Sequence, residues 1–195
     1  KTAYEMQRSL VGSDMRIRYG NHLNLGIRYG YIEQLDDELL RISKESFDAL
    51  SFNCYALSPD HEKMNHALEI SGLPMIIGEY HFGTVDRGLA QSLWQVNSQK
   101  ERGDAFRYYT ENAFAHRGLI GTGWFRWIDQ NINGRTDGEN YNCGFIDVTD
   151  RPYPYMVDAA IKTAKSLYEI HSGTKTPFHQ APNAVGHSPI PDLWE

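Results

Sequence analysis

One carboxylate at the end of an apolar run is the residue best placed to do chemistry in this sequence. The run extends from Leu73 to Gly78, and Glu79 follows it directly. Its centre, Met75 to Ile77, shows no polar alternation, which is typical of a strand buried on both faces of a parallel sheet. A carboxylate at the mouth of such a strand is poorly solvated, and burying its charge unpaired is costly. We therefore take Glu79 as the centre of a candidate site.

Polar and aromatic side chains follow the other predicted strands as well. The strand-end residues are Arg28 and Tyr29, Asn53 and Tyr55, Glu79 and His81, and Trp127 and Asp129. The carboxyl ends of parallel barrel strands form the face on which active sites are built. We therefore expect these side chains to lie together.

Carboxylate chemistry fits this arrangement. Glycoside hydrolysis needs two carboxyl groups that flank the scissile bond, and in the retaining form one of them attacks as an ionised nucleophile. We assign that role to Glu79 and expect Tyr55 to hold it by a hydrogen bond. The alternative for Glu79 is a structural ion pair with a nearby arginine. Trp127 is expected to be a platform under a sugar ring, the alternative being a core tryptophan.

Rival chemistries lack their motifs. His61 and His66 are five residues apart, whereas a zinc helix needs histidines four apart on one face, so we expect no metal site and no cofactor. Gly121-Thr122-Gly123 lacks the third glycine of a dinucleotide fingerprint and continues as a strand. No Gly-x-Ser-x-Gly elbow and no phosphate loop occur.

The elements that must position these residues alternate between strands and helices. Apolar runs predict strands over 21–30, 49–56, 73–79 and 119–127, and helical spacing predicts helices over 3–12, 36–49, 61–71, 101–117 and 154–170. Residues 129–143 form a polar loop, and residues 172–195 are expected to be irregular. Four strands that alternate with helices indicate an α/β fold with a parallel sheet.

Composition excludes several classes of protein. The 195 residues are 41% hydrophobic and carry a net charge of −6, without a basic block, so nucleic acid is not an expected partner. No apolar run is long enough for a membrane span, and no signal peptide is visible. Because the first residue is Lys1, we expect that a leader or a longer upstream region was removed. Cys54 and Cys143 are predicted to be packed free thiols.

The motifs resemble those of clan A glycoside hydrolases, and most closely the family 50 agarases. The similarity covers roughly residues 15–170. The matching stretches are His22-Leu23-Asn24-Leu25-Gly26-Ile27-Arg28, Ser51-Phe52-Asn53-Cys54-Tyr55, Ile76 to Gly83 with Asp86-Arg87-Gly88, Trp124-Phe125-Arg126-Trp127, Gly134 to Phe145, and Val148 to Pro154.

This resemblance implies a (β/α)8 TIM barrel, of which this chain supplies strands five to eight. It implies that Glu79 is the nucleophile at the end of strand seven and that Trp127 lies under the sugar at the end of strand eight. It also implies a retaining enzyme that cleaves β-linked galactose in agarose without a metal. The clan's acid/base, a Glu that follows Asn at the end of strand four, has no counterpart in this sequence.

The chain therefore predicts half of a barrel, because a full one needs about 250 residues. We expect residues 1–171 to be the C-terminal half of the catalytic domain and residues 172–195 to be a tail. Strands five and eight would be open edges, so we expect the missing half to be another chain, a swapped copy or absent sequence.

The polar loop offers further candidates for substrate contact. Arg135, Glu139 and Asn140 are expected to bond sugar hydroxyls, or alternatively to hold their own loop together, and Arg28, Asn53 and His81 are expected to contact substrate from the strand ends. We do not expect Glu139 or Asp137 to replace the missing acid/base.

The sequence thus predicts a retaining glycoside hydrolase that acts on an agarose-like polysaccharide. A non-catalytic carbohydrate-binding relative and a purely structural subunit remain alternatives, as do other β-galactans, β-glucans or β-mannans as substrates. The substrate class favours a secreted or periplasmic location.

Overall fold

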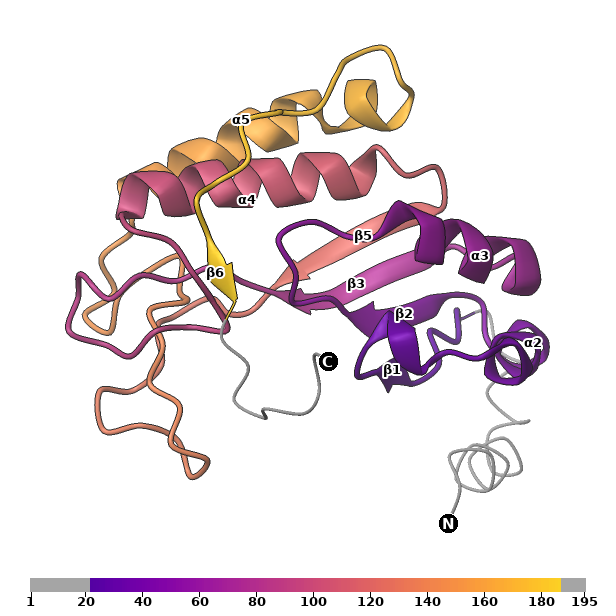
Figure 1. Cartoon of the computed structure of the whole chain (residues 1–195), viewed down its shortest axis with the longest axis horizontal. Helices are drawn as coiled ribbons and strands as arrows, with labels where there is room; N and C mark the ends of the chain where they lie inside the picture. Colours follow the sequence, from indigo (N-terminus) through magenta and orange to yellow (C-terminus); the bar gives the residue numbers. More distant parts are fainter. Residues whose placement is uncertain (1–21, 187–195) are drawn as a thin grey trace.

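The computed structural model describes residues 22–186, and its central element is a parallel sheet of four strands (Figure 1). The strands are β1 (Arg28–Tyr29), β2 (Leu50–Asn53), β3 (Met75–Tyr80) and β5 (Leu119–Trp124), in the order β1-β2-β3-β5. All three pairings are parallel. In the described part of the chain the sheet does not close on itself, so β1 and β5 are its edges.

A helix lies in each connection between neighbouring strands, as parallel pairing requires. The α-helices are α2 (Asp37–Ser46), α3 (His61–Ser71), α4 (Gln99–Phe114) and α5 (Pro154–His171), and a short 3-10 helix, η2, covers Ile32–Gln34. Asp36, Asp60 and Ser98 cap α2, α3 and α4 by accepting hydrogen bonds from amides of the first turn. The cap on Ser98 makes α4 begin two residues earlier than predicted. Helices α4 and α5 lie side by side along the sheet in Figure 1.

The core lies between the sheet and these helices. Leu50, Phe52, Met75, Ile77 and Leu119 are fully buried, and they pack in one apolar cluster with side chains from α3, α4 and α5. Burial alternates along β2 and over Met75 to Gly78 of β3, as the two-residue period of a strand requires, and the alternation breaks at Glu79, where the register with β5 is irregular.

The opposite face of the sheet is less covered. Ile76 is half-buried and Ile120 is 56% exposed. The expectation that the strand at 73–79 is buried on both faces is therefore wrong for the described chain, because only the helix face is packed.

Strand β3 carries one residue that packs against the helices and one that lies at the candidate site. Tyr80 is buried against α4, where its ring stacks on Tyr109 at 4.0 Å and its hydroxyl lies 2.5 Å from Thr110 Oγ1. Glu79, one residue earlier, lies at the carboxyl end of the sheet instead.

The first predicted strand is much shorter than expected. Only Arg28 and Tyr29 pair with β2. Gly26 has a φ of 69°, which is not extended backbone, and a Cβ at this position would collide with the ring of Phe47. The strand therefore begins after this turn.

Two short strands lie outside the predicted set. Strand β4 (Trp94–Gln95) follows β3 and pairs antiparallel with β6 (Val185–Gly186), which brings the segment after α5 back across α4 (Figure 1). The expected irregular tail is thus ordered in part as far as residue 186. The helix predicted over 3–12 lies outside the described residues. Among the helices that are described, none is long and apolar enough to cross a membrane.

Candidate active site

The register of the sheet brings the predicted strand-end residues together. In the pairing of β2 with β3, Asn53 lies opposite Glu79 after a one-residue shift between Phe52 and Asn53. Arg28 reaches the same point from β1, and Tyr55 reaches it from just beyond β2. We call these four residues, Arg28, Asn53, Tyr55 and Glu79, the Glu79 cluster.

Both oxygens of the Glu79 carboxylate accept from the cluster. Arg28 Nη2 lies 2.7 Å from Oε1, Tyr55 donates its hydroxyl hydrogen to Oε2 at 2.8 Å, and Asn53 Nδ2 donates to Oε2 at 3.3 Å. The expected hydrogen bond from Tyr55 is present. The ion pair with an arginine, which was the structural alternative for Glu79, is present too.

Tyr55 is suited to remain a donor. Burial raises the pKa of its hydroxyl strongly, and the hydrogen bond and charge of Glu79 raise it further. The phenol therefore stays protonated at neutral pH. Tyr55 thus supplies a hydrogen bond to the Glu79 carboxylate, and Arg28 supplies a positive charge beside it.

A glycine makes room for the arginine. A Cβ on Gly78 would collide with the aliphatic stem of Arg28, which lies across the strand at this point. The Arg28 side chain is half exposed, and 19% of the Glu79 side chain is accessible. The carboxylate is thus held from three sides and still reaches the surface of the described chain.

His81 occupies a different place from the one expected. It is 2% exposed, its Nδ1 faces the carbonyl oxygen of Phe125 at 3.2 Å, and the Leu93 amide donates to its Nε2 at 3.2 Å. Burial, followed by the charge of Arg102, lowers the pKa of His81 to about 3. Since both ring nitrogens are engaged by the backbone, His81 has none left to offer to a sugar.

Trp127 is exposed, as a sugar platform requires. Its side chain is 67% accessible, and its ring stacks on Phe145 with centroids 5.8 Å apart and an interplanar angle of 21°. The reading of Trp127 as a core residue therefore does not fit. In the described residues no hydrogen bond or ring contact links Trp127 to the Glu79 cluster.

The polar loop after β5 is largely bonded to itself. Arg135 contacts Asp137 at 2.5 Å and Glu139 at 3.2 Å, and Gln130 donates to Glu139 at 2.7 Å. Asn140 donates to the carbonyl oxygen of Ile132 at 3.4 Å. These contacts match the alternative in which the loop residues hold their own loop together. The loop still lies near the cluster, because its Tyr141 contacts the ring of His81, which in turn contacts the ring of Tyr55.

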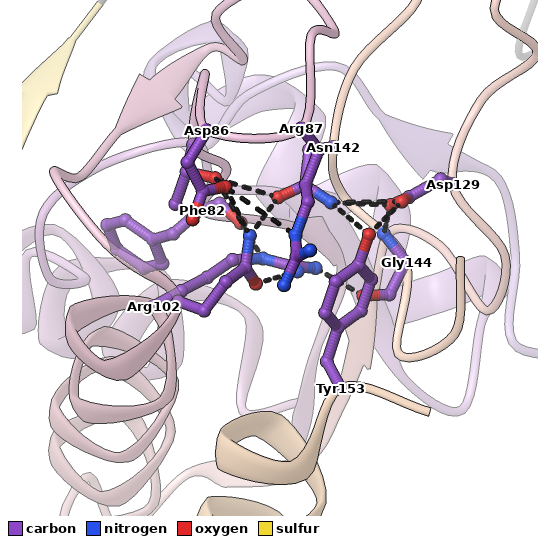
Figure 2. Close-up of polar contacts among 10 residues, drawn as sticks. Phe82, Asp86, Arg87, Arg102, Asp129, Asn142, Gly144 and Tyr153 are labelled. Carbon is purple, nitrogen blue, oxygen red and sulfur yellow. Dashed lines mark hydrogen bonds and ion pairs between the residues drawn. The ribbon is translucent and has the colours of Figure 1, made fainter. Parts of the chain in front are cut away.

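A second group of polar side chains, which was not predicted as a unit, is buried between the exit of β3, α4 and the loop after β5 (Figure 2). We call it the buried network, and its side chains are Thr84, Asp86, Gln99, Arg102, Asp129, Asn142 and Tyr153. Arg102 is fully buried, and it donates to the carbonyl oxygens of Phe82 and Gly144 and to Gln99 Oε1. It therefore joins the exit of β3 to the loop after β5.

Asp129 is the carboxylate of this network. It is 4% exposed and accepts from Asn142 Nδ2 at 2.9 and 3.0 Å, from the Gly144 amide at 2.6 Å and from the Tyr153 hydroxyl at 2.6 Å. The Arg102 guanidinium lies 4.9 Å from the centre of the Tyr153 ring (Figure 2). Asp129, expected at the strand-end face, is thus a structural residue.

The described residues contain no group of three or more His, Cys, Asp or Glu placed to hold a metal ion. Cys54 and Cys143 are buried free thiols, as predicted, and burial raises the pKa of Cys54 to about 11 and that of Cys143 to about 12. For chemistry, the candidate site offers a carboxylate fixed by hydrogen bonds, an exposed indole ring and several hydrogen-bond donors.

Comparison with known proteins finds similarity to agarases. The chain is 36% identical over 165 residues to "Beta-agarase A" of Vibrio sp. (strain JT0107), a match that covers 81% of this chain and 16% of that protein. It matches the structure of PfGH50B at 37% identity and a TM-score of 0.76, over 84% of this chain and 24% of that one. It matches the crystal structure of the agarase AgWH50C at 35% identity and the same TM-score, over 84% and 23%. No protein-family model matches the chain.

The chain is thus a relative of the family 50 β-agarases over a small part of their length. It spans about a sixth of the curated relative and less than a quarter of the two solved structures. Its parallel sheet matches part of those structures, as the resemblance implied.

Proposed function

We propose that this chain carries the nucleophile side of a retaining glycoside hydrolase that cleaves a β-linked galactose polysaccharide of the agarose type. Glu79 is the nucleophile, and Tyr55 orients it. The acid/base carboxylate comes from outside this chain, from the half of the barrel that would cover Ile76 and Ile120. The named agarases among the relatives support the substrate class.

The observation that carries this proposal is the set of hydrogen bonds that the Glu79 carboxylate accepts. A nucleophile in glycoside hydrolysis must be ionised, oriented and left with a free lone pair. A carboxylate offers about four acceptor positions. Among the described residues, Oε2 accepts from Tyr55 and Asn53, whereas Oε1 accepts from Arg28 alone, so Oε1 keeps a position with which to attack.

In the first step, Oε1 of Glu79 forms a bond to the anomeric carbon while the bond to the leaving oxygen breaks. The outside acid protonates that oxygen, and a glycosyl ester on Glu79 remains. In the second step, the same outside group takes a proton from water, the water oxygen attacks the anomeric carbon, and Glu79 leaves as a carboxylate. The two carboxyl groups should lie about 5–5.5 Å apart.

The exposed indole of Trp127 provides the apolar surface on which a galactose ring would stack. Its stacking on Phe145 holds the indole in one orientation without covering it. Arg28 and Asn53 lie beside the carboxylate and would also reach hydroxyls of the bound sugar. Arg135, Glu139 and Asn140 shape the loop near them, and we now assign them a mainly structural role.

The ion pair between Arg28 and Glu79 favours a second candidate function, in which the cluster only binds carbohydrate or stabilises the sheet. Such a protein would bind agarose oligosaccharides through Trp127 and never cleave them. The two candidates differ in whether a bond to Glu79 ever forms.

The test uses the complete protein, with the rest of the barrel present, on agarose and other β-linked galactans. Glu79→Gln should abolish turnover, and Glu79→Ala with added azide should yield an α-galactosyl azide, because azide then attacks from the vacated side. Glu69→Gln removes the same charge from an exposed position of α3 and is the matched control. Unchanged turnover in Glu79→Gln would refute the proposal, and binding without cleavage by the unsubstituted protein would favour the second candidate.

A further inference from the structure

His81 is the buried side chain next to the Glu79 cluster for which the chemistry above has no use. It follows β3 directly, two residues after Glu79, and it is 2% exposed. The Leu93 backbone amide can only donate, so Nε2 of His81 must accept from it with its lone pair. Nδ1 therefore carries the proton and donates it to the Phe125 carbonyl oxygen. The geometry selects one neutral tautomer.

These two hydrogen bonds join three segments of the chain. Phe125 follows β5 and Leu93 precedes β4, so the imidazole bridges the exits of β3 and β5 and the long segment between β3 and α4. Burial and the charge of Arg102 hold its pKa at about 3, which keeps the ring neutral. A charged imidazole would lose the acceptor that the Leu93 amide needs.

The same ring also contacts the residue that orients the nucleophile. The ring centroids of His81 and Tyr55 are 5.0 Å apart, at an interplanar angle of 67°, and the edge of Tyr141 meets His81 from the polar loop at 5.8 Å. Tyr55 donates to Glu79 Oε2 from this position. The imidazole is thus fixed by the backbone on both nitrogens and limits where the Tyr55 ring can lie.

We propose that His81 is a positioning residue of the hydrolase, which fixes the Tyr55 ring and through it the direction of the Glu79 carboxylate. This inference rests on the proposed function. Supporting contacts of this kind matter because a displacement of about 1 Å in a reacting group can lower a rate by about 100-fold. No contact between His81 and the sugar is required.

The first test needs no activity. In the long-range proton–nitrogen NMR spectrum of the ¹⁵N-labelled chain, His81 should show a protonated Nδ1 and an unprotonated Nε2, unchanged from pH 8 to pH 5. A ring protonated on Nε2, or a ring that titrates near pH 6.5, would overturn the inference.

The second test is kinetic and uses the complete protein. His81→Ala should lower kcat by about 100-fold and change KM by less than about threefold, since the substrate is not contacted. His81→Asn keeps an amide near the Nδ1 position and should recover part of that loss. The double variant, Tyr55→Phe with His81→Ala, should have a kcat no more than about threefold lower than that of the slower single variant. The losses should not multiply, because both residues act on the same carboxylate.

His116 provides the matched control. It is 3% exposed, the Gly118 amide donates to its Nδ1 at 3.1 Å, and its Nε2 lies 3.1 Å from Asn65 Oδ1, at the opposite end of α4 from the site. His116→Ala should lower the melting temperature as His81→Ala does and leave kcat within about twofold, since the packing and hydrogen bonds that it removes lie away from the site.

The outcomes separate this inference from the proposed function. Equal kcat in His81→Ala and His116→Ala, or fully multiplicative losses in the double variant, would overturn the role of His81 while an inactive Glu79→Gln still upheld the nucleophile. Full turnover in Glu79→Gln would instead refute the proposed function itself.

Discussion

The two carboxylates at the carboxyl end of the sheet, Glu79 and Asp129, are both held by hydrogen bonds and nevertheless differ in what they can do. Asp129 accepts four hydrogen bonds, from Asn142 twice, the Gly144 amide and Tyr153, and is 4% exposed. Glu79 accepts from Arg28, Asn53 and Tyr55, and 19% of its side chain is accessible.

The difference lies in how many acceptor positions of each carboxylate are filled, and it agrees with the separate roles that we propose for them. Both have a tyrosine hydroxyl and an asparagine amide as donors. All of the roughly four acceptor positions of Asp129 are filled from within the protein, so it has nothing to offer a substrate. Glu79 keeps one position and an accessible side, and that unfilled position is what a nucleophile needs.

The largest expected effect sets the two residues against each other in one assay. Glu79→Gln should lower kcat of the complete protein by about four orders of magnitude or more, because an amide cannot form the glycosyl ester. Asp129→Asn should leave kcat per folded molecule within about tenfold, since that carboxylate touches no substrate. Initial rates on an agarose oligosaccharide, corrected for the folded fraction, measure both. The reverse order of losses would break the comparison.

Stability should show the opposite ranking. Asp129→Asn places an amide NH₂ against buried donors from Tyr153, Asn142 or Gly144, so the free energy of unfolding should fall by about 2–3 kcal/mol. Glu79→Gln should change it by less than about 1 kcal/mol, because Arg28 is half exposed. Urea unfolding followed by tryptophan fluorescence gives both values. Equal losses would mean that the Glu79 cluster is structural as well.

Tyr55→Phe should have a smaller effect on the same site. It removes the shorter hydrogen bond to Oε2 and leaves Asn53 as the only donor to that oxygen. We expect kcat to fall by about 10- to 100-fold with little change in KM. Tyr153→Phe is the equivalent change at Asp129 and should lower stability and not kcat. Steady-state kinetics of the two variants would refute the distinction if both were equally slow.

Acid should weaken the fold through His81. Its pKa is about 3 in the folded chain and about 6.5 in the unfolded chain, so the unfolded state binds more protons between these values. The stability linked to the neutral ring is therefore complete above pH 6.5 and is lost as the pH falls toward 3. Unfolding in urea at pH 7, 5.5 and 4.5 should show a smaller loss in His81→Asn than in the unsubstituted chain. Parallel losses would show that His81 does not titrate as stated.

The smallest effect is expected in the polar loop. Arg135→Ala breaks exposed contacts to Asp137 and Glu139, so it should cost less than about 1 kcal/mol of stability. KM should rise by no more than about threefold if the loop only shapes the edge of the candidate site. A tenfold rise in KM would instead restore the expectation that Arg135 binds sugar directly.

The strand ends could be predicted from the sequence because they follow from local patterns. An apolar run that ends on Glu79 and another that ends at Asn53 and Tyr55 predict neighbouring parallel strands, and their register then sets the contact between Tyr55 and Glu79. Helix α3 and its cap also follow from local signals, with Asp60 before it and Gly72 after it.

The buried network could not be predicted, because its contacts join residues far apart in the chain. Gln99 donates a hydrogen bond to Asn142, and Arg102 donates one to the carbonyl oxygen of Gly144, each across more than 40 residues. No periodic pattern in the sequence predicts either contact. His81 was expected to contact substrate, because its burial could not be seen in the sequence. Its partners Leu93 and Phe125 lie in irregular segments, which carry no periodic pattern. Polarity alone does not tell whether a side chain faces a cleft or a neighbouring loop.

The alternation in β3 has a consequence for how this sequence can change in length. Glu79 faces the candidate site, and Tyr80 packs on Tyr109 and Thr110 of α4. A one-residue insertion or deletion before Glu79 in β3 would move Glu79 away from the site and Tyr80 away from its packing on α4. An insertion or deletion of this kind should abolish activity when it falls in β3. The same change should be tolerated in the exposed part of the 129–143 loop. A library of single-codon insertions and deletions should therefore contain no active variants altered in β3, the strand that carries the proposed nucleophile.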